Sequence, residues 1–366
     1  MGKVKAIAFY LPQFHPIKEN DEWWGKGFTE WTNVAKAKPM FPGHYQPHIP
    51  ADLGFYDLRL SEARIAQADL AKKYGISAFC YWHYWFGNGR RILERPFEEV
   101  LESGTPDFPF CLAWANETWS GIWHGNPKTI LVEQVYPGEQ DYIDHFYSIL
   151  PAFKDNRYFK VDGKPLFMVY KPMEIPDLPL FVSTFRRLAA ENGLEGIHLV
   201  ATNVDPDWDT DKYGFDALTP AVHTKDSYLR SANKFVDIYR RAKTSRLNKY
   251  YKKIFKRPVR IYNYKDAIQE FDENSGNNIY YPTVIPNWDN SPRSGLNGFI
   301  LHDSTPELFK KAMVNAVRMV KKYDPENQIV FIKSWNEWAE GNHLEPDLKF
   351  GHKYLEVVKD VLQTKD

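Results

Sequence analysis

Eight short apolar runs alternate with helix-like segments along the chain, and this alternation constrains the fold more than any other feature. The runs are rich in β-branched and aromatic residues, which are typical of strands. They lie at 4–12, 76–85, 108–117, 164–171, 196–203, 214–220, 280–288 and 328–335. Helix-like patterns occupy 61–75, 94–103, 140–152, 178–192, 305–322 and 350–363. Eight strands alternating with helices predict an α/β fold, a single (β/α)8 TIM barrel.

A doubly wound open sheet is the alternative fold for such an alternation. No Gly-rich phosphate-binding fingerprint follows any of the runs, which counts against that alternative. The chain has 366 residues, enough for one large barrel. We therefore expect residues 1–366 to form a single catalytic domain with long βα loops. A basic helical insertion at about 221–278 separates strands six and seven.

The ends of the predicted strands carry the chemically informative residues. Catalytic residues of a TIM barrel lie at the carboxyl ends of its strands. Five of the eight runs end in aromatic residues mixed with amides, histidines or acids: YLPQFH, YWHYW, WANETW, PNWDN and WNEWAE. A less specific explanation is that a barrel rich in aromatic residues places some of them there anyway. The pattern favours a carbohydrate cleft, because sugar rings stack on aromatic faces and sugar hydroxyls bind polar groups.

Two carboxylates and two tryptophans stand close together after the eighth run, in KSWNEWAEGNHLEPD. Glycoside cleavage requires one carboxylic acid that keeps its proton and a second carboxylate beside it. Apolar walls and a neighbouring negative charge raise the pKa of such an acid. A solvated acidic loop is the alternative reading. We predict Glu337 and Glu340, flanked by Trp335 and Trp338, as catalytic residues, and we expect Glu340 to be the more desolvated of the two.

Further polar and aromatic residues at the strand ends are candidates for binding substrate. Asn116 and Glu117 follow the third run, where they either bind sugar hydroxyls or cap a helix. His15 and His83 are either sugar ligands or buried histidines bonded to the backbone. The predicted substrate-binding residues are Tyr10, His15, His83, Trp114, Asn116, Glu117, Trp288, Asp289, Trp335, Asn336 and Trp338.

One acidic segment, DPDWDTDKYGFD at 205–216, imitates a calcium-binding loop. Its sixth position holds Thr210 instead of glycine, and its twelfth holds Asp216 instead of glutamate. The triplet Asp209–Asp211 also resembles the metal-binding Asp-x-Asp of nucleotide-sugar transferases, but such triplets arise often by chance in acidic loops. We predict no metal ligand and no cofactor in this chain.

The balance of 47 basic and 47 acidic side chains gives no indication of a nucleic-acid partner. Segment 225–265 departs from this balance, with 14 Lys or Arg against two Asp. One reading is a pair of solvated helices packed on the barrel. The other is a basic flap that attracts an anionic polysaccharide, a lipid-linked substrate or a membrane surface peripherally. No run approaches the ~20 apolar residues of a transmembrane helix.

The cysteine content and the N-terminus bear on the compartment. Cys80 and Cys111 are the only cysteines, a count that fits a reducing compartment better than a disulfide scaffold. The apolar part of the N-terminus is shorter than the usual ~7–15 residues of a signal sequence. We expect a cytoplasmic protein.

Five segments resemble the WbsX-type, glycoside hydrolase family 99-like proteins: FYLPQFHPIKENDEWWGKGFTEWTNV, QPHIPADLGFYDL, FPFCLAWANETW, KVDGKPLFMVY and WNEWAEGNHLEP. Members occur in gene clusters for bacterial surface polysaccharides and have often been labelled glycosyltransferases. The NEWAEG core is also similar to the Asn-Glu-Trp-x-Glu-Gly motif of family 99 endo-α-mannosidases and endo-α-mannanases. Those enzymes are retaining (β/α)8 proteins that need no metal.

This resemblance implies specific roles for the two glutamates. Glu337 is expected to act as the base on the sugar 2-hydroxyl, forming a 1,2-anhydro intermediate, and Glu340 as the general acid and then base. The leading hypothesis is a retaining, endo-acting glycoside hydrolase on a bacterial polysaccharide or its precursor. The alternatives are a glycosyltransferase or transglycosylase of surface-polysaccharide assembly, and a non-catalytic carbohydrate-binding protein.

Overall fold

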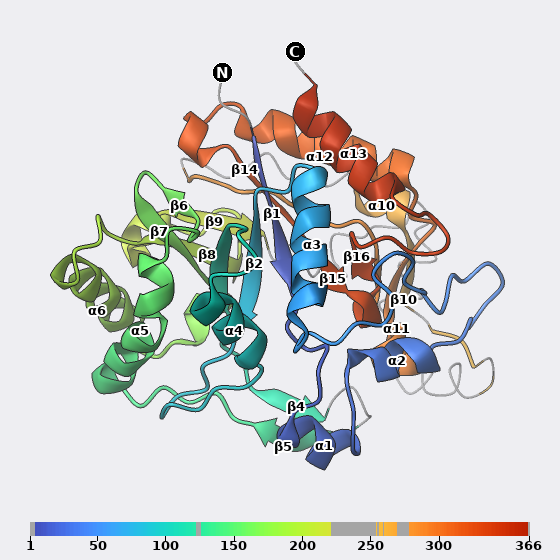
Figure 1. Cartoon of the computed structure of the whole chain (residues 1–366), viewed down its shortest axis with the longest axis horizontal. Helices are drawn as coiled ribbons and strands as arrows, with labels where there is room; N and C mark the ends of the chain where they lie inside the picture. The colour runs from blue at the N-terminus through green and yellow to red at the C-terminus, as the bar shows by residue number, and fades with distance from the viewer. Residues whose placement is uncertain are drawn as a thin grey trace.

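A parallel sheet of eight strands forms the centre of the protein (Figure 1). The computed structural model describes residues 4–121, 126–220, 254, 256–258, 260–268 and 278–364. The strands follow the order β11-β14-β1-β2-β3-β7-β8-β9 in the sheet. Their bounds are β1 (Lys5–Tyr10), β2 (Ala78–His83), β3 (Phe110–Trp114), β7 (Lys164–Val169), β8 (His198–Val204), β9 (Ala217–Pro220), β11 (Thr283–Val284) and β14 (Ile329–Ile332). Each corresponds to one of the eight apolar runs.

The two outer strands of this sheet meet and close it. Leu218 of β9 forms a parallel bridge with Tyr280, and the amide of Tyr281 donates to the carbonyl oxygen of Leu218 at 2.9 Å. The hydroxyl oxygens of Thr219 and Thr283 lie 2.7 Å apart. Together with the helices between the strands, this closure makes the predicted (β/α)8 barrel.

Helices cover the outer surface of the sheet (Figure 1). They are α3 (Ser61–Lys73), α4 (Arg95–Ser103), α5 (Glu139–Lys154), α6 (Leu178–Glu191), α12 (Pro306–Val320) and α13 (Lys353–Gln363). Side-chain caps begin two of them: Asp177 accepts from the amide of Leu180, and Thr305 accepts from that of Leu308. Each cap satisfies an amide that has no partner within its own helix. The sequence predicted all six helices.

Side chains of the strands alternate between the barrel interior and the helices outside. On β1, the Phe9 ring stacks on Trp82 of β2 with the ring centroids 4.9 Å apart. The next residue, Tyr10, points the other way, and its hydroxyl donates to Gln67 of α3 at 2.6 Å. A shift of one residue along a strand therefore moves a side chain from the interior to the opposite face.

The seventh apolar run was predicted as one strand over 280–288, and this prediction is wrong in its extent. The run joins the barrel only through residues 280–284, and Pro286, which has no amide hydrogen to donate to a ladder, follows the end of that pairing. After Pro286 the chain enters a three-stranded sheet of order β10-β13-β12. Its strands are β10 (Arg260–Asn263), β12 (Trp288–Asp289) and β13 (Phe299–His302).

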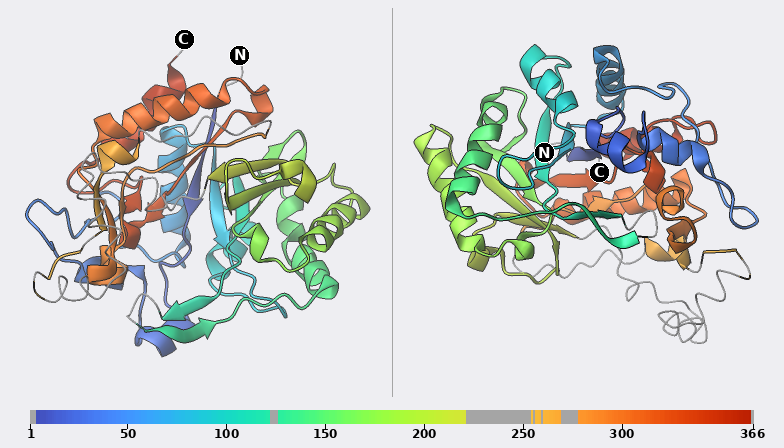
Figure 2. Two further views of the ribbon diagram at one scale, coloured as in Figure 1. Left: turned by 180° about the vertical axis from the view of Figure 1, so that it is seen from behind. Right: turned by 90° about the horizontal axis from the view of Figure 1, so that it is seen from below.

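Smaller elements surround the barrel. They are α1 (Lys18–Trp24), α2 (Glu30–Lys36), β4 (Trp119–Gly121), β5 (Asn126–Val132), β6 (Lys160–Val161), α7 (Thr210–Tyr213), α10 (Tyr264–Ala267), α11 (Ser291–Ser294), β15 (Asn336–Glu337) and β16 (Asn342–His343). In Figure 1, α1 and the β4–β5 hairpin lie together below the barrel. Both termini lie at the opposite end, as the left view of Figure 2 also shows. Most of the predicted basic insertion at 221–278 lies outside the described residues.

Candidate active site

The segment after β14 forms a tight hairpin, β15–β16, that presents Glu337 and Glu340. Gly341 ends the turn between the two strands with a φ of 65°, and a Cβ atom there would lie 3.0 Å from the backbone nitrogen of Asp289. Both the positive φ and this close approach require glycine. Within the hairpin, the amide of Glu337 donates to the Ser334 hydroxyl at 3.0 Å. These contacts fix the two carboxyl groups on one short turn.

Glu337 lies at the inner end of the site. Its carboxyl oxygen Oε1 accepts from Trp82 Nε1 at 2.8 Å and from Lys333 Nζ at 3.2 Å. Burial raises the pKa of the Glu337 carboxyl to about 7, with Lys333 opposing the rise and the adjoining Glu340 carboxyl adding to it. A base with a pKa near 7 exchanges its proton at neutral pH, which is the range in which general bases work best.

Glu340 lies nearer the solvent and pairs with a buried arginine. Its Oε1 atom binds the guanidinium of Arg293, whose Nε donates to Glu30 Oε2 at 3.0 Å. The side chain of Glu340 is 14% exposed, against 4% for Glu337. The expectation that Glu340 is the more desolvated carboxyl is therefore wrong. The reason is that Trp82 and Lys333 cover Glu337.

These side chains form one charged group, here named the Glu337 cluster: Glu30, Arg293, Lys333, Glu337 and Glu340. It contains three carboxyl groups and two basic groups, an ammonium and a guanidinium. With every group ionised, one negative charge would be left over in a mostly buried position, which is unfavourable. Burial also raises the pKa of Glu30 and that of Glu337, and a raised pKa favours the protonated form of a carboxyl group. We infer that the cluster holds one proton near neutral pH.

Four members of the Glu337 cluster, all except Glu30, line a cavity of about 340 Å³. Aromatic side chains form much of its wall, namely Trp23, Trp24, Trp82, Tyr84, Trp119 and Tyr170. Trp23 of α1 and Trp119 of β4 meet edge to face, with the ring centroids 6.1 Å apart. Asn20 also lines the cavity, is fully buried, and has no hydrogen-bond partner for its amide among the described residues. Apolar faces beside free polar groups suit a sugar ligand.

Glu117 is the third predicted site residue that lines this cavity. Its carboxylate pairs with Lys171 Nζ at 3.1 Å. The neighbouring Asn116 does not line the cavity. Its amide donates to the carbonyl of Lys171 and accepts from the amide of Lys171, each at 2.8 Å. Asn116 therefore joins the loops that follow β3 and β7.

Tyr10, His83 and Trp114 all point away from the cavity, to the outer face of the sheet. Tyr10 bonds to Gln67 of α3, and His83 Nε2 lies 2.9 Å from His145 Nε2 on α5. Trp114 packs against the same histidine, with the rings 4.7 Å apart. Each stands one residue away from an inward-facing position, so the alternation of the strand turns it outward. The sequence placed them on the wrong face.

Trp288, Asp289 and His15 also lie outside the lining of the cavity. Trp288 is buried, and Lys333 Nζ lies 5.4 Å from the centre of its ring. Asp289 is turned away and accepts from His44 Nε2 at 2.7 Å. Burial lowers the pKa of His15 to about 4. None of the three residues is placed to contact a substrate in this cavity.

Another buried carboxyl group, Glu345, follows the hairpin in the chain. Its oxygens accept from Trp338 Nε1 at 2.6 Å, from Gln67 Nε2 at 2.6 Å and from the Tyr56 hydroxyl at 2.9 Å. Burial raises the pKa of Glu345 to about 7. We name Tyr56, Gln67, Trp338 and Glu345 the Glu345 cluster.

The two remaining predicted residues of this segment also have structural contacts. Asn336 accepts from the amide of Leu11 at 2.7 Å and donates to its carbonyl oxygen at 3.0 Å. Trp335 is fully buried and lies 5.1 Å from the ring of Phe79. Both residues attach the hairpin to the barrel, and neither lines the cavity.

Among the site residues that the sequence reasoning missed, four surround the two glutamates: Trp82, Lys333, Arg293 and Glu30. Trp82 could have been found, because it precedes His83 and strand alternation turns one of the two inward. Lys333 stands four residues before Glu337 in the same motif. Arg293 and Glu30 gave no signal, since they are 263 residues apart in the chain and only the fold brings them together.

The acidic segment at 205–216 has ordinary structural contacts. Asp209 begins α7 by accepting from the amide of Lys212 at 3.0 Å. Asp216 accepts from the amide of Leu199 at 2.8 Å and pairs with Arg186 at 2.9 Å. Two of the acids that imitate a calcium loop are therefore used by the fold itself.

Among the described residues, no helix combines the length and the apolar character required to cross a bilayer.

Comparison with solved structures shows the same barrel elsewhere. A protein described as glycoside hydrolase-like has a TM-score of 0.61 at 16% identity, covering 100% of this chain and 95% of its own. The GH99 endo-alpha-mannosidase from Bacteroides thetaiotaomicron has a TM-score of 0.57 at 15% identity, covering 98% of this chain and 96% of its own.

Comparison of sequences gives closer relatives. The uncharacterized protein WxcX of Xanthomonas campestris pv. campestris strain B100 is 36% identical over 97% of this chain and 49% of its own length. WxcX of strain ATCC 33913 matches equally well. The chain thus spans about half the length of these relatives. The family model described as glycosyltransferase WbsX matches residues 6–358. The chain belongs to the WbsX family.

Proposed function

We propose that this protein is a retaining, endo-acting glycoside hydrolase that cleaves a bacterial polysaccharide or its precursor. The observation that carries the proposal is the pair of Glu337 and Glu340, which share one cavity and interact directly. The surplus of one carboxylate over the cations of the Glu337 cluster gives this pair a single proton to work with. Glycosidases require one protonated and one ionised carboxyl group.

The proposed reaction keeps that single proton on the pair throughout. In the first half, ionised Glu337 takes the proton of the sugar 2-hydroxyl, and the 2-oxygen attacks the anomeric carbon to form a 1,2-anhydro sugar. Protonated Glu340 gives its proton to the departing glycosidic oxygen. In the second half, Glu340 takes a proton from water as the water opens the 1,2-anhydro ring, and Glu337 returns its proton to the 2-oxygen.

Arg293 sets the starting point of this exchange. In the empty cavity its guanidinium favours the ionised form of Glu340, whereas Glu337 holds its proton up to about pH 7. The proton must therefore pass from Glu337 to Glu340 before the first half-reaction. The contact between the two carboxyl groups provides a direct path. The same arginine then stabilises the Glu340 carboxylate that the first half-reaction leaves behind.

The lining of the cavity favours binding of uncharged sugar residues next to the bond that is cleaved. Six aromatic side chains offer stacking faces, and Asn20 offers an amide without a partner among the described residues. The GH99 relative in structure is an endo-alpha-mannosidase, but its 15% identity carries the fold and not the sugar. We further propose that the whole substrate is anionic or linked to a lipid and that the protein acts in the cytoplasm.

The test is a screen of defined oligosaccharides and bacterial surface polysaccharides, with products identified by NMR. Hydrolysis that produces new reducing ends within a chain supports the proposal. Wild-type protein that binds oligosaccharides without cleaving any of them would instead indicate a carbohydrate-binding protein.

The description of the family model favours a second candidate, a glycosyltransferase or transglycosylase of surface-polysaccharide assembly. A glycosyltransferase would bind a nucleotide sugar, and such binding raises the melting temperature. Absence of a shift with the common nucleotide sugars, combined with cleavage of a polysaccharide, excludes it. A transglycosylase would transfer the cleaved fragment to an added acceptor sugar instead of to water.

A further inference from the structure

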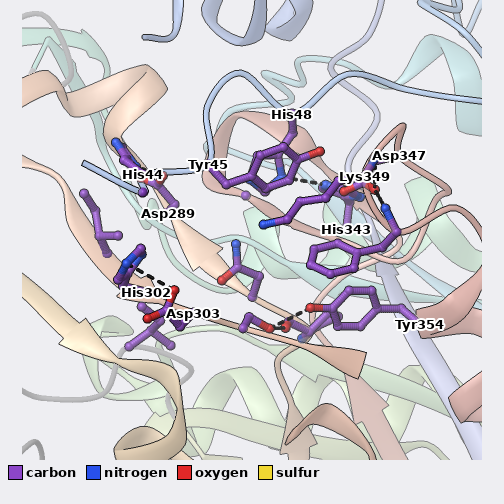
Figure 3. Close-up of a pocket in the computed structure, with 18 residues that line it drawn as sticks. His44, Tyr45, His48, Asp289, His302, Asp303, His343, Asp347, Lys349 and Tyr354 are labelled. Carbon is purple, nitrogen blue, oxygen red and sulfur yellow. Dashed lines mark hydrogen bonds and ion pairs between the residues drawn. The ribbon is translucent and has the colours of Figure 1, made fainter. Parts of the chain in front are cut away.

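A second, smaller cavity is lined in part by residues of the β15–β16 hairpin, and Figure 3 shows the side chains around it. It has a volume of about 50 Å³, and both Gly341 and Asp289 line it. Histidines reach it from three separate parts of the chain, and two of them lie in contact. His48 comes from the loop between α2 and α3, and His343 comes from β16. Asp347 follows four residues after His343. The proposed hydrolase reaction uses none of these three side chains.

We propose that His48, His343 and Asp347 bind one divalent cation of the zinc class. Each offers a ligand atom, and these atoms lie within 4.8 Å of one another. His48 Nδ1 and His343 Nε2 are 2.8 Å apart. Around a tetrahedral zinc with bonds of about 2.0–2.1 Å, donor atoms lie roughly 3.3 Å apart, so the two rings must separate by about 0.5 Å and the carboxylate must move closer. The cation then takes the place of the proton between the two nitrogens.

The fold orients two of these ligands in advance. His343 Nδ1 lies 2.9 Å from the backbone carbonyl oxygen of Glu345, so this nitrogen carries the hydrogen and Nε2 presents its lone pair to His48. Histidine ligands of metals are commonly held in this way. Asp347 Oδ1 accepts from the backbone amides of Lys349 at 3.0 Å and Phe350 at 2.6 Å. Those two bonds, together with a hydrogen bond from the Tyr45 hydroxyl, hold the carboxylate in place, and its remaining lone pairs can bind a cation.

The histidine pair is incompletely satisfied by its own hydrogen bond. His48 is 3% exposed, and its Nε2 atom has no hydrogen-bond partner among the described residues. A buried polar atom without a partner is unfavourable. A cation bound at His48 Nδ1 leaves the ring hydrogen on Nε2, which a water molecule can accept, and a cavity of about 50 Å³ has room for one.

The chemistry of the three ligands selects the class of cation. Two imidazoles and one carboxylate suit zinc and neighbouring transition metals, whereas calcium and magnesium prefer ligand sets made of oxygen. One cationic side chain, Lys349, lies close by. Its Nζ stands 4.3 Å from the centre of the Tyr45 ring and 4.7 Å from that of Phe350. Cation–π attraction to these two rings holds the ammonium group beside them.

The position of this site indicates what the cation does. The His343 ring stacks on Trp338, with the centroids 3.7 Å apart, and Trp338 belongs to the turn that carries Glu340. A cation bound by His48 and His343 would join the 43–48 loop to the back of this turn. It would stabilise the hairpin without entering the substrate cavity.

The experiment measures metal content and thermal stability of the purified chain. After incubation with zinc and dialysis, we expect about one equivalent of zinc per chain, and the melting temperature should rise by about 5 °C at a hundredfold excess over Kd. Excess chelator should reverse the rise. Cobalt in place of zinc should give the intense visible absorption of a tetrahedral site, which tests the proposal on the wild-type chain alone.

Two variants and one control assign the ligands. His343→Gln and His48→Gln should each lose the bound zinc and the thermal shift. His302→Gln should retain both, because His302 lines the same cavity but pairs with Asp303. Far less than one equivalent of zinc, an unchanged melting temperature, or equal zinc binding in the His48 and His343 variants would overturn the proposal. If a variant does not fold, the cobalt spectrum of the wild-type chain still decides.

Discussion

The Glu337 cluster and the Glu345 cluster both include residues of the segment that follows β14, and their central glutamates look alike by two common criteria. Glu337 is 3% exposed and Glu345 is 2% exposed. Burial raises the pKa of each carboxyl group to about 7. They differ in their surroundings: Glu337 lines a cavity beside a second carboxyl and two cations, whereas Glu345 is enclosed by the side chains of Trp338, Gln67 and Tyr56.

A raised pKa alone therefore does not identify a catalytic acid, because the carboxyl group must also be accessible to the substrate. Burial raises the pKa of both carboxyl groups, but only Glu337 lines a cavity in which a ligand can reach it. The Glu345 carboxyl instead binds the hairpin to α3, through Gln67. We therefore expect substitutions in the two clusters to separate activity from stability.

The largest expected effect is loss of activity on substituting the cavity carboxyl groups. Glu337→Gln and Glu340→Gln should each lower kcat by about 10³-fold or more, because each removes one proton-transfer group. Glu345→Gln is the matched control, with the same change in the same segment, and should keep activity within a few-fold. Equal losses in all three variants would show that the clusters do not differ in function.

The leaving group should distinguish Glu337 from Glu340. Glu340→Gln should retain some activity on an aryl glycoside with a good leaving group, since that group departs without being protonated. Glu337→Gln should remain inactive on the same substrate, because formation of the 1,2-anhydro ring is blocked. A 2-deoxy substrate should bind without being cleaved. Rapid cleavage of that substrate would replace the 1,2-anhydro route with direct attack by a carboxylate.

The second largest effect concerns the stability of the Glu337 cluster. Arg293→Met should lower the free energy of unfolding by about 3–5 kcal/mol, because it leaves Glu30 and Glu340 without their shared cation. Adding Glu30→Gln should restore part of the loss. Urea unfolding of the three proteins measures this. Full stability in the single variant would mean that the arginine does not compensate these carboxyl groups.

The third effect is a change in how stability depends on pH. The folded state raises the pKa of Glu345 from 4.5 to about 7. Its stabilising contribution is therefore complete below pH 4.5 and is lost as the pH rises through 7. Relative to wild type, Glu345→Gln should remove a dependence of about 3 kcal/mol over that window. Urea unfolding gives the free energy of unfolding of both proteins at several pH values. Their difference at each pH cancels the contribution of the buried histidines, which titrate in both proteins.

The smallest effect is expected at the wall of the substrate cavity. Asn20→Ala should raise KM about three- to tenfold and leave kcat nearly unchanged, since one hydrogen bond to substrate contributes roughly 0.5–1.5 kcal/mol. Asn192→Ala, at the end of α6 and away from the cavity, serves as the control. A fall in kcat with constant KM would assign Asn20 to the chemical step instead of to binding.

The barrel could be predicted from the sequence because each strand and helix has a local signature. Asp177 and Thr305, for example, stand where side chains that cap helices are expected. The two glutamates were recognisable for a similar reason, since they form a short motif with their tryptophans. The contacts of Arg293 with Glu30 could not be predicted, because those two residues meet only in the folded barrel.

The direction of each side chain was the other limit. Tyr10, His83 and Trp114 were chosen for their chemistry at strand ends, yet all three face the helices. The apolar runs are buried on both faces, so their composition does not reveal which residues face inward. Once one inward-facing residue of a strand is known, such as Phe9 or Trp82, the alternation gives the direction of the other side chains of that strand.

The anomeric configuration of the first product tests the central claim most directly. Proton NMR during cleavage of a polysaccharide by the wild-type chain should show the new reducing end with the configuration of the bond that was cut, before mutarotation. The same sample with Glu337→Gln should show no product. An inverted first product, or undiminished cleavage by Glu337→Gln, would contradict a retaining mechanism in which Glu337 and Glu340 exchange one proton.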